Sequence, residues 1–278
     1  MENIHFLNGK FVSEKDLLIS PRDLGYSRGY AVFDFLITYQ QRPFLLQKHI
    51  DRLFLSAETI GLSIPWSKEE ISQLTMETLN ANTALSGEKV IRISISGGPS
   101  LTLTPPDSPT ILITIDPHVP CPSEHYNNGV GVMTVAFQRY QPSAKTNNYI
   151  EAIRHFRKLT TPQIDEIIYH SDNMVREGTR SNIFALIDDK LLTPKTNILK
   201  GVTREVLLST LKLEIPVIAE DFSIDTLRAA TEVFITATGK GVMPVTMIDN
   251  DLVGGGTVGQ ITKEVMRQHQ AFIHSNQW

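Results

Sequence analysis

The sequence predicts an α+β fold made of two domains, and three observations support this prediction. The chain has 278 residues, 41% of them hydrophobic and 20% charged, which allows a sizeable core and exceeds the usual length of one domain. Helix-like and strand-like stretches follow one another without regular alternation. Three prolines fall within "DPHVPCPSEH", where neither a helix nor a central strand is expected. We therefore expect an N-terminal domain at 1–118, a linker at 119–124 and a C-terminal domain at 125–278.

The N-terminal half is expected to hold two helices among its strands. Ile50 and Leu53 begin a series of apolar residues at three- and four-residue spacing, which predicts an amphipathic helix. Ser67 followed by Glu70 is typical of a capping box at the start of the next helix. The predicted helices cover 47–62 and 67–82, and the predicted strands cover 3–8, 31–46 (with a break at Gln41–Arg42), 88–96 and 110–115.

The C-terminal half shows the same mixture. Alternating or continuous apolar runs predict strands, and longer runs with helical spacing predict helices. The predicted strands cover 130–138, 166–170, 181–187 and 232–237, and the predicted helices cover 148–159, 203–213, 223–230 and 257–273.

Composition argues against several classes of function. A formal charge of −4 and the lack of a dense Lys/Arg run disfavour nucleic-acid binding. The first residues lack the basic and apolar regions of a signal peptide, and no apolar run approaches the ~18 residues of a membrane span. Cys121 is the single cysteine, so no internal disulfide can form. We expect a soluble, cytoplasmic protein.

Short motifs with a known mechanism are almost absent. "GGGTVG" at 254–259 matches the glycine pattern of dinucleotide-binding turns, but it lies too near the C-terminus for a βαβ unit and is interpreted as a turn before the last helix. The eight histidines show no metal-ligand spacing, so no metal site is expected.

Polar residues gather at a few places instead. "MVREGTRSNIFAL" (174–186) places Glu177 and Gly178 at an expected turn before an apolar strand, which fits either a solvated hairpin end or a site that needs a fixed negative charge. Arg52 lies at the edge of an apolar helix stripe and Lys145 in a short loop, and either could be an ordinary surface residue. Gly201 precedes a helix, whose free N–H groups favour anions, as at any helix start.

The order of these clusters resembles the class IV aminotransferases, the fold-type IV enzymes that use pyridoxal 5′-phosphate (PLP). The resemblance extends from "FLNGKFV" through "HIDRLFLSA", "AKTNNY", "EGTRSNIF" and "LKGVTRE" to "ITATGKGVMPV", which is nearly the whole chain. It implies a smaller N-terminal α/β domain, a larger C-terminal α+β PLP-binding domain, and a homodimer.

The resemblance also implies a role for each cluster. Lys145 matches the lysine that forms the Schiff base with PLP and moves a proton at the substrate Cα. Glu177 matches the carboxylate that binds the pyridine nitrogen, and Gly178 is expected to let the backbone pass close to the ring. The remaining cofactor contacts would be the phosphate ligands Arg52, Val202, Thr203 and Thr238 and the ring hydroxyl partner Tyr149. Arg180 and Asn182 are expected to support the Glu177 strand, and a role of Arg180 near the ring stays open.

The expected substrate follows from the positions at which this sequence differs from the typical patterns of the family. Phe33 replaces the tyrosine of typical D-amino-acid aminotransferases, and Val90 replaces a tyrosine of typical branched-chain enzymes. Three cations, Arg28, Arg92 and Lys240, would suit a dicarboxylate such as 2-oxoglutarate or D-glutamate. The pattern is similar to an atypical bacterial group of D-amino-acid aminotransferases acting with 2-oxoglutarate or pyruvate. Each of the three cations could instead be a surface charge.

Three other functions stay open on the sequence alone. The cofactor residues are shared with branched-chain L-amino-acid aminotransferases and with aminodeoxychorismate lyase. A non-enzymatic PLP-binding protein is disfavoured because both Lys145 and Glu177 are present.

Overall fold

A computed structural model describes residues 2–159, 163–275 and 278. The chain forms two compact units. The first comprises Met1–Val119 together with Ser143–Asn148, and the second comprises Pro120–Pro142 and Tyr149–Trp278. The short segment Ser143–Asn148, expected from the sequence to belong to the C-terminal domain, thus groups with the first unit.

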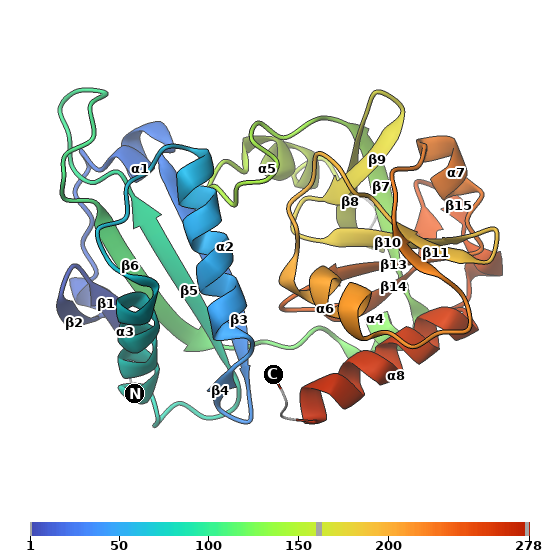
Figure 1. The fold of residues 1–278 in the computed structure, drawn as a ribbon, viewed down its shortest axis with the longest axis horizontal. Helices are drawn as coiled ribbons and strands as arrows, with labels where there is room; N and C mark the ends of the chain where they lie inside the picture. Colours follow the sequence, from blue (N-terminus) through green and yellow to red (C-terminus); the bar gives the residue numbers. More distant parts are fainter. Residues whose placement is uncertain (1, 160–162, 276–277) are drawn as a thin grey trace. The chain divides into compact units, whose positions relative to one another are not determined.

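The first unit is built on a six-stranded antiparallel sheet with the order β2-β1-β6-β5-β3-β4 (Figure 1). Buried isoleucines alternate with other residues along two neighbouring central strands, where Ile91, Ile93 and Ile95 are opposite Ile115, Ile113 and Ile111. Its strands are β1 (Ile4–Leu7), β2 (Lys10–Ser13), β3 (Ala31–Tyr39), β4 (Arg42–Pro43), β5 (Lys89–Ser96) and β6 (Thr110–Pro117).

Two helices cover one face of this sheet (Figure 1). Helix α2 (Leu46–Thr59) buries Ile50 and Leu53 against it, as its apolar spacing predicted. Helix α3 (Lys68–Asn80) begins with the predicted capping box, because the Ser67 hydroxyl accepts from Glu70 N and the Glu70 carboxylate accepts from Ser67 N. The other face carries Phe33, Arg92, Ser94 and Ser96, next to the short helix α1 (Leu24–Arg28).

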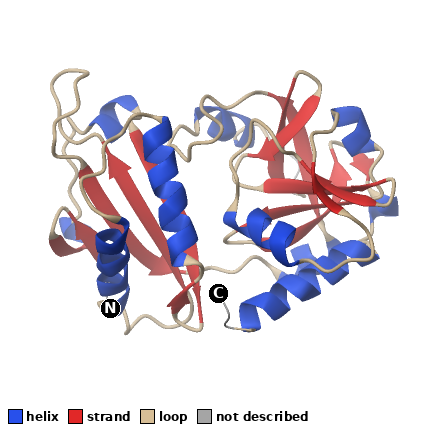
Figure 2. Ribbon diagram, in the orientation of Figure 1, coloured by secondary structure: helices blue, strands red, loops and turns tan. Residues whose placement is uncertain are grey.

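The second unit contains a nine-stranded mixed sheet with the order β12-β11-β10-β13-β14-β7-β8-β9, and β15 pairs with β14. Its strands are drawn in red in Figure 2. Its strands are β7 (Val130–Ala136), β8 (Ile164–Ser171), β9 (Met174–Gly178), β10 (Asn182–Ile187), β11 (Lys190–Thr193), β12 (Val217–Ala219), β13 (Glu232–Ala237), β14 (Gly241–Ile248) and β15 (Asp251–Leu252). Its helices are α4 (Ser123–Asn128), α5 (Ile150–Phe156), α6 (Val202–Thr210), α7 (Ile224–Arg228) and α8 (Gln260–His274).

Glu177 and Gly178 are strand residues, so their expected placement at a turn was wrong. They end β9, which pairs with β8, and the chain bends at Thr179 and Arg180. The polar composition of this stretch suggested a loop, but Arg176, Glu177 and Thr179 are all buried, and each has hydrogen-bond partners inside the unit. A buried strand can be polar when its side chains are paired in this way.

No helix in the described part of the chain is long and apolar enough to cross a membrane.

Candidate active site

The loop that carries Lys145 is attached to strand β3 and helix α2 of the first unit. Phe33 N donates to Lys145 O at 3.0 Å, and Thr146 forms an isolated antiparallel bridge with Val32. Lys145 N in turn donates to the Ser56 hydroxyl at 3.0 Å, 89 residues away in the sequence. The backbone of this loop is therefore fixed on both sides of the lysine.

Phe33 brings Lys145 and Arg92 together on one face of the sheet. The Lys145 ammonium nitrogen lies 4.8 Å from the centre of the Phe33 ring, and the Arg92 guanidinium carbon lies 3.7 Å from the same centre. Both distances are within the range of cation–π attraction. Phe33 is opposite Ser94 in the sheet register, so Arg92, two residues before Ser94, points to the same face. The predicted lysine and one predicted carboxylate-binding arginine are thus neighbours.

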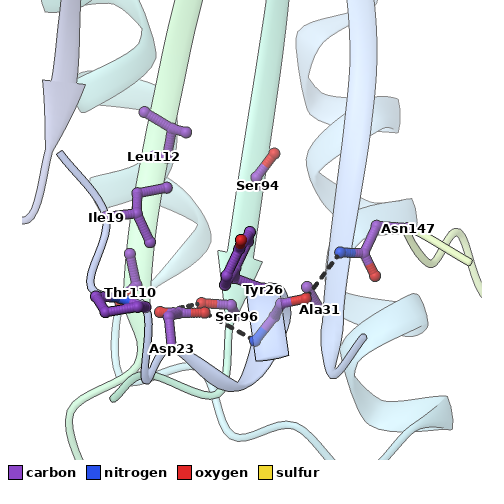
Figure 3. Close-up of a pocket in the computed structure, with 11 residues that line it drawn as sticks. Ile19, Asp23, Tyr26, Ala31, Ser94, Ser96, Thr110, Leu112 and Asn147 are labelled. Carbon is purple, nitrogen blue, oxygen red and sulfur yellow. Dashed lines mark hydrogen bonds between the residues drawn. The ribbon is translucent and has the colours of Figure 1, made fainter. Parts of the chain in front are cut away.

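A cavity of about 440 Å³ opens on this same face (Figure 3). Ser94, Ser96 and Thr110 contribute hydroxyl groups from β5 and β6, and Asn147, two residues after Lys145, borders it from the lysine loop. The Asp23 carboxylate accepts from Gly25 N at 2.7 Å and from the Ser96 hydroxyl at 2.8 Å, which ties α1 to the sheet. The cavity can accommodate a small polar molecule.

Arg52 lies on α2 and is held by a buried carboxylate. Its Nε and Nη2 donate to the two oxygens of Asp34 at 2.9 and 2.8 Å, and His49 Nδ1 lies 2.6 Å from Asp34 Oδ1. Burial alone would raise the pKa of the Asp34 carboxyl, but Arg52 and His49 outweigh it and hold that pKa well below its usual range. Burial lowers the pKa of His49 in spite of Asp34, which favours a neutral ring.

Glu177 in the second unit is held at both carboxylate oxygens. Arg139 Nη1 donates to Oε1 at 2.8 Å, and Leu199 N donates to Oε2 at 2.9 Å. Burial on its own would lower the pKa of Arg139, but the Glu177 carboxylate raises it above the ordinary value. Such an ion pair favours the charged form of both partners. A carboxylate has about four acceptor positions, so these bonds are compatible with a further donor.

Asn182 links Glu177 to the start of helix α6. Its amide donates to Leu199 O at 2.8 Å and accepts from Gly201 N at 3.1 Å, so it holds both ends of the segment whose Leu199 N–H binds Glu177. Gly201 is the N-cap of α6 and has no side chain that could accept a hydrogen bond from the first turn. The first backbone N–H groups of the helix, including those of Val202 and Thr203, are therefore not capped by this residue. The expected supporting role of Asn182 agrees with these contacts.

The end of β13 lies next to this helix start. Thr236 is opposite Asn182 in the sheet register, and its buried hydroxyl has no hydrogen-bond partner among the described residues. Thr238 follows two residues later, in the turn before β14. An unpartnered hydroxyl near an uncapped helix start is a donor set suited to an anionic group such as a phosphate.

Gly178 is required by packing inside the second unit. A Cβ at this position would lie 2.1 Å from the Ser181 hydroxyl and 3.1 Å from Glu166 Cγ. Ser181 and Thr179 both donate to the buried Glu166 carboxylate, so these side chains are not free to move aside. Contacts within the protein therefore exclude a side chain at position 178. They explain the glycine without the close approach to a cofactor ring that was expected from the sequence.

The other expected site residues lie in different settings. Tyr149 is the N-cap of α5 in the second unit. The Arg180 guanidinium lies 5.3 Å from the centre of the Phe156 ring. Lys240 forms an ion pair with Asp165, and exposed Arg28 donates to Ser27 O at 2.8 Å. These contacts do not join Arg28 or Lys240 to the Lys145–Arg92 cluster.

Several residues of the site were not predicted from the sequence. No local sequence pattern distinguishes Asp34, His49, Ser56 and Arg139 from ordinary residues. Their hydrogen-bond partners lie between 3 and 89 residues away in the sequence. In the described part of the chain, no group of three or more His, Cys, Asp or Glu side chains could hold a metal ion.

Comparison with known proteins shows the family. Residues 31–248 match the class IV aminotransferases. A D-alanine aminotransferase from Staphylococcus epidermidis is 31% identical over 277 residues, which are 98% of each chain. A Methanocaldococcus jannaschii protein, provisionally named a branched-chain-amino-acid aminotransferase, is 35% identical over 272 residues, covering 94% of this chain and 93% of its own.

Solved structures agree on the fold. The branched-chain aminotransferase of Thermoproteus uzoniensis, solved with norvaline, has a TM-score of 0.89 at 25% identity, covering all of this chain and 96% of its own. A PLP-bound hypothetical aminotransferase from Mycobacterium tuberculosis has a TM-score of 0.85 at 21% identity, covering 99% of this chain and 100% of its own. The α+β fold predicted from the sequence is thereby confirmed as that of the fold-type IV enzymes. The chain belongs to the class IV aminotransferases, enzymes that use PLP.

Proposed function

We propose that this enzyme transfers the amino group of a D-amino acid to a 2-oxo acid such as 2-oxoglutarate or pyruvate. The observation that carries an acidic acceptor such as 2-oxoglutarate is the Arg92 guanidinium held on the Phe33 ring, with the Lys145 amine over the same ring, and the D-alanine aminotransferases among the relatives favour a D-amino acid. A fixed guanidinium beside the reactive amine provides a bidentate partner for a carboxylate. A purely apolar substrate side chain would gain nothing from it.

The first unit supplies the reactive amine and one phosphate ligand. When bound, PLP supplies an aldehyde that reacts with amines and a ring that withdraws electrons. Lys145 provides the amine that receives and returns the proton at the substrate Cα. Arg52, whose Nε and Nη2 donate to Asp34, would bind the phosphate through its guanidinium group.

The second unit would supply the remaining cofactor ligands. Glu177 would accept the N–H of the pyridine ring, and Arg139 and Leu199 N keep its carboxylate in one orientation. Val202 and Thr203 at the start of α6, with the Thr238 hydroxyl, would bind the phosphate. Tyr149 would donate to the ring hydroxyl.

Arg92 is the first candidate for binding a substrate carboxylate, with Arg28 and Lys240 as further cations. The 440 Å³ cavity beside the lysine loop, lined by the hydroxyls of Ser94 and Ser96, accommodates the rest of a small substrate. Lys240 takes part only if its ion pair with Asp165 opens or is shared.

A branched-chain L-amino-acid aminotransferase is the second candidate. It is favoured by the 35% identity to the Methanocaldococcus jannaschii protein and by the branched-chain enzymes among the structural neighbours. The D-alanine aminotransferases of staphylococci support the first candidate to a similar degree.

A half-reaction screen decides between the two. Each amino acid is added alone to the PLP-loaded enzyme, and the rate at which the visible band of lysine-bound PLP disappears is recorded. We expect D-glutamate and D-alanine to react faster than L-leucine and L-isoleucine. The opposite order would replace the D-specific function with the branched-chain one.

We also propose that the enzyme works as a homodimer. The family resemblance implies it, and exposed apolar side chains of the first unit support it, including Tyr26, Leu101 and Leu103, which are 79%, 81% and 79% exposed. Light scattering on the active protein tests this, because a mass near 31.1 kDa would be that of a monomer.

A further inference from the structure

One buried hydroxyl connects the two residues that would hold opposite ends of the cofactor. The Ser56 hydroxyl donates to the backbone carbonyl of Arg52 at 2.8 Å and accepts from the backbone N–H of Lys145 at 3.0 Å. Ser56 is fully buried on helix α2, one turn after Arg52. The same side chain thus contacts the main chain of both residues.

We propose that Ser56 is a positioning residue that sets the location of the Lys145 amine relative to Arg52. This proposal rests on the proposed roles of those two residues. PLP is rigid between its aldehyde and the atom that carries its phosphate chain, so the enzyme must fix the separation of the amine and the phosphate ligand. A hydrogen bond from α2 to the lysine loop fixes that separation directly.

Among the attachments of the lysine loop, the hydrogen bond to Ser56 bears most directly on the distance between Lys145 and Arg52. Phe33 N–H and the bridge from Thr146 to Val32 attach the loop to strand β3. Asn147 donates to Gly25 O at 3.4 Å, a long bond toward α1. Among the described hydrogen bonds of Lys145, the bond to Ser56 is the one that leads to the helix of Arg52. Without it, the loop keeps its attachment to β3 but loses a hydrogen bond to the helix that carries the proposed phosphate ligand.

Ser56→Ala tests the proposal with little risk to the fold, because it removes one oxygen atom. The matched control is Thr75→Val on helix α3. Thr75 is also fully buried and its hydroxyl donates to the carbonyl four residues earlier, Ile71 O, at 2.7 Å. The control removes the same kind of bond in the same unit, away from the lysine loop.

Three measurements, namely amide hydrogen exchange, the rate of PLP attachment and steady-state kinetics, separate positioning from stability. In Ser56→Ala, amide hydrogen exchange of the segment Ser143–Asn148 should become roughly 3- to 10-fold faster, with or without PLP, because the Lys145 N–H loses its acceptor. The rate of attachment of added PLP and the kcat should each fall roughly 10-fold or more, since a displacement of about 1 Å can cost about 100-fold. The KM should change by less than about threefold, because the substrate contacts are kept.

Thr75→Val should lower the melting temperature and leave exchange in that segment, PLP attachment and kcat unchanged. If Ser56→Ala instead behaves like Thr75→Val in all three measurements, Ser56 has only a structural role and the proposal is wrong. A wild-type protein that never attaches PLP to a lysine would contradict the proposed function itself. Failure of the proposed function is seen in the wild-type protein alone, so it can be distinguished from failure of the Ser56 proposal.

Discussion

Arg139 donates a hydrogen bond of 2.8 Å to the carboxylate of Glu177, 38 positions further along the chain, and the Glu177 side chain is only 4% exposed. Leu199 N–H holds the second oxygen of the same carboxylate at 2.9 Å. The negative charge is therefore fixed in place by partners from two different loops. The polar residues next to Glu177 in the sequence are explained in this way, because they order the segment that holds the negative charge of Glu177.

Glu177→Gln should keep PLP bound but slow the removal of the Cα proton. A neutral amide stabilises the positively charged pyridine ring less than a carboxylate does. We expect a loss of at least about 100-fold in the half-reaction rate, which corresponds to about 2.7 kcal/mol. Stopped-flow absorbance measures it. Glu205→Gln is the control, because Glu205 is half exposed and pairs with Arg204 instead. Equal rates for wild type and Glu177→Gln would remove Glu177 from the mechanism.

Arg52→Ala should mainly weaken cofactor affinity. The loss of a charge-assisted contact to a phosphate is worth about 2–3 kcal/mol, or roughly 30- to 150-fold in Kd. Titration of the cofactor-free protein with PLP checks this. Lys68→Ala provides the control, since Lys68 pairs with Asp51 in an exposed ion pair of the same unit. A variant with normal PLP affinity and altered substrate preference would contradict the phosphate assignment.

Arg92→Ala and Arg28→Ala should each raise the KM for D-glutamate far more than they disturb PLP binding. An arginine that holds a carboxylate through charge-assisted hydrogen bonds contributes roughly 1.5–3 kcal/mol, which is about 10- to 150-fold in kcat/KM. Steady-state kinetics with D-glutamate and D-alanine measure the effect. If only Arg92→Ala responds, the exposed Arg28 is a surface charge, and if neither responds, the dicarboxylate pocket is wrong.

His269 should make the protein less stable in mild acid. Burial lowers the pKa of this side chain to about 4, and its Nε2 has no hydrogen-bond partner in the described part of the chain. In the unfolded chain the pKa is near ~6.5. Between these values the unfolded state binds the proton and the folded state does not. The stabilisation is therefore complete above about pH 6.5 and is lost as the pH falls toward 4, at up to about 1.4 kcal/mol per pH unit.

Urea unfolding between pH 4 and 7 tests this for wild type and His269→Leu. The variant should show a flatter dependence on pH, with a remaining slope from His49, whose pKa burial also lowers. His274→Leu, at the exposed end of the same helix, should leave the slope unchanged. An unchanged slope in His269→Leu would mean that this histidine is not the source.

The sequence predicted most elements whose pattern is local. The apolar spacing of α2, the capping box of α3 and the strand at 232–237 agree with the structure. Strand β9 was missed because its side chains are polar and buried, and β14 was missed because Gly241 and Pro244 resemble turn residues. Pairing with long-range neighbours decides such strands, and their own composition does not.

The sequence proposed site residues only where a motif carries the chemistry. Lys145, Glu177 and Arg52 stand in recognisable stretches, so the resemblance proposed their roles. Asp34, Ser56 and Arg139 are ordinary residues in sequence, and their importance depends on which distant backbone or side chain they contact. Only the fold specifies those contacts.

The proposed mechanism depends above all on Lys145 as the reactive amine. Treating the PLP-loaded protein with borohydride fixes the cofactor to its lysine, and mass spectrometry of the digest then identifies the modified peptide. We expect the phosphopyridoxyl mass on Lys145, and neither this modification nor the visible band nor transamination in Lys145→Ala. Modification of another lysine, such as Lys200 or Lys240, with an unchanged band in Lys145→Ala, would contradict the account.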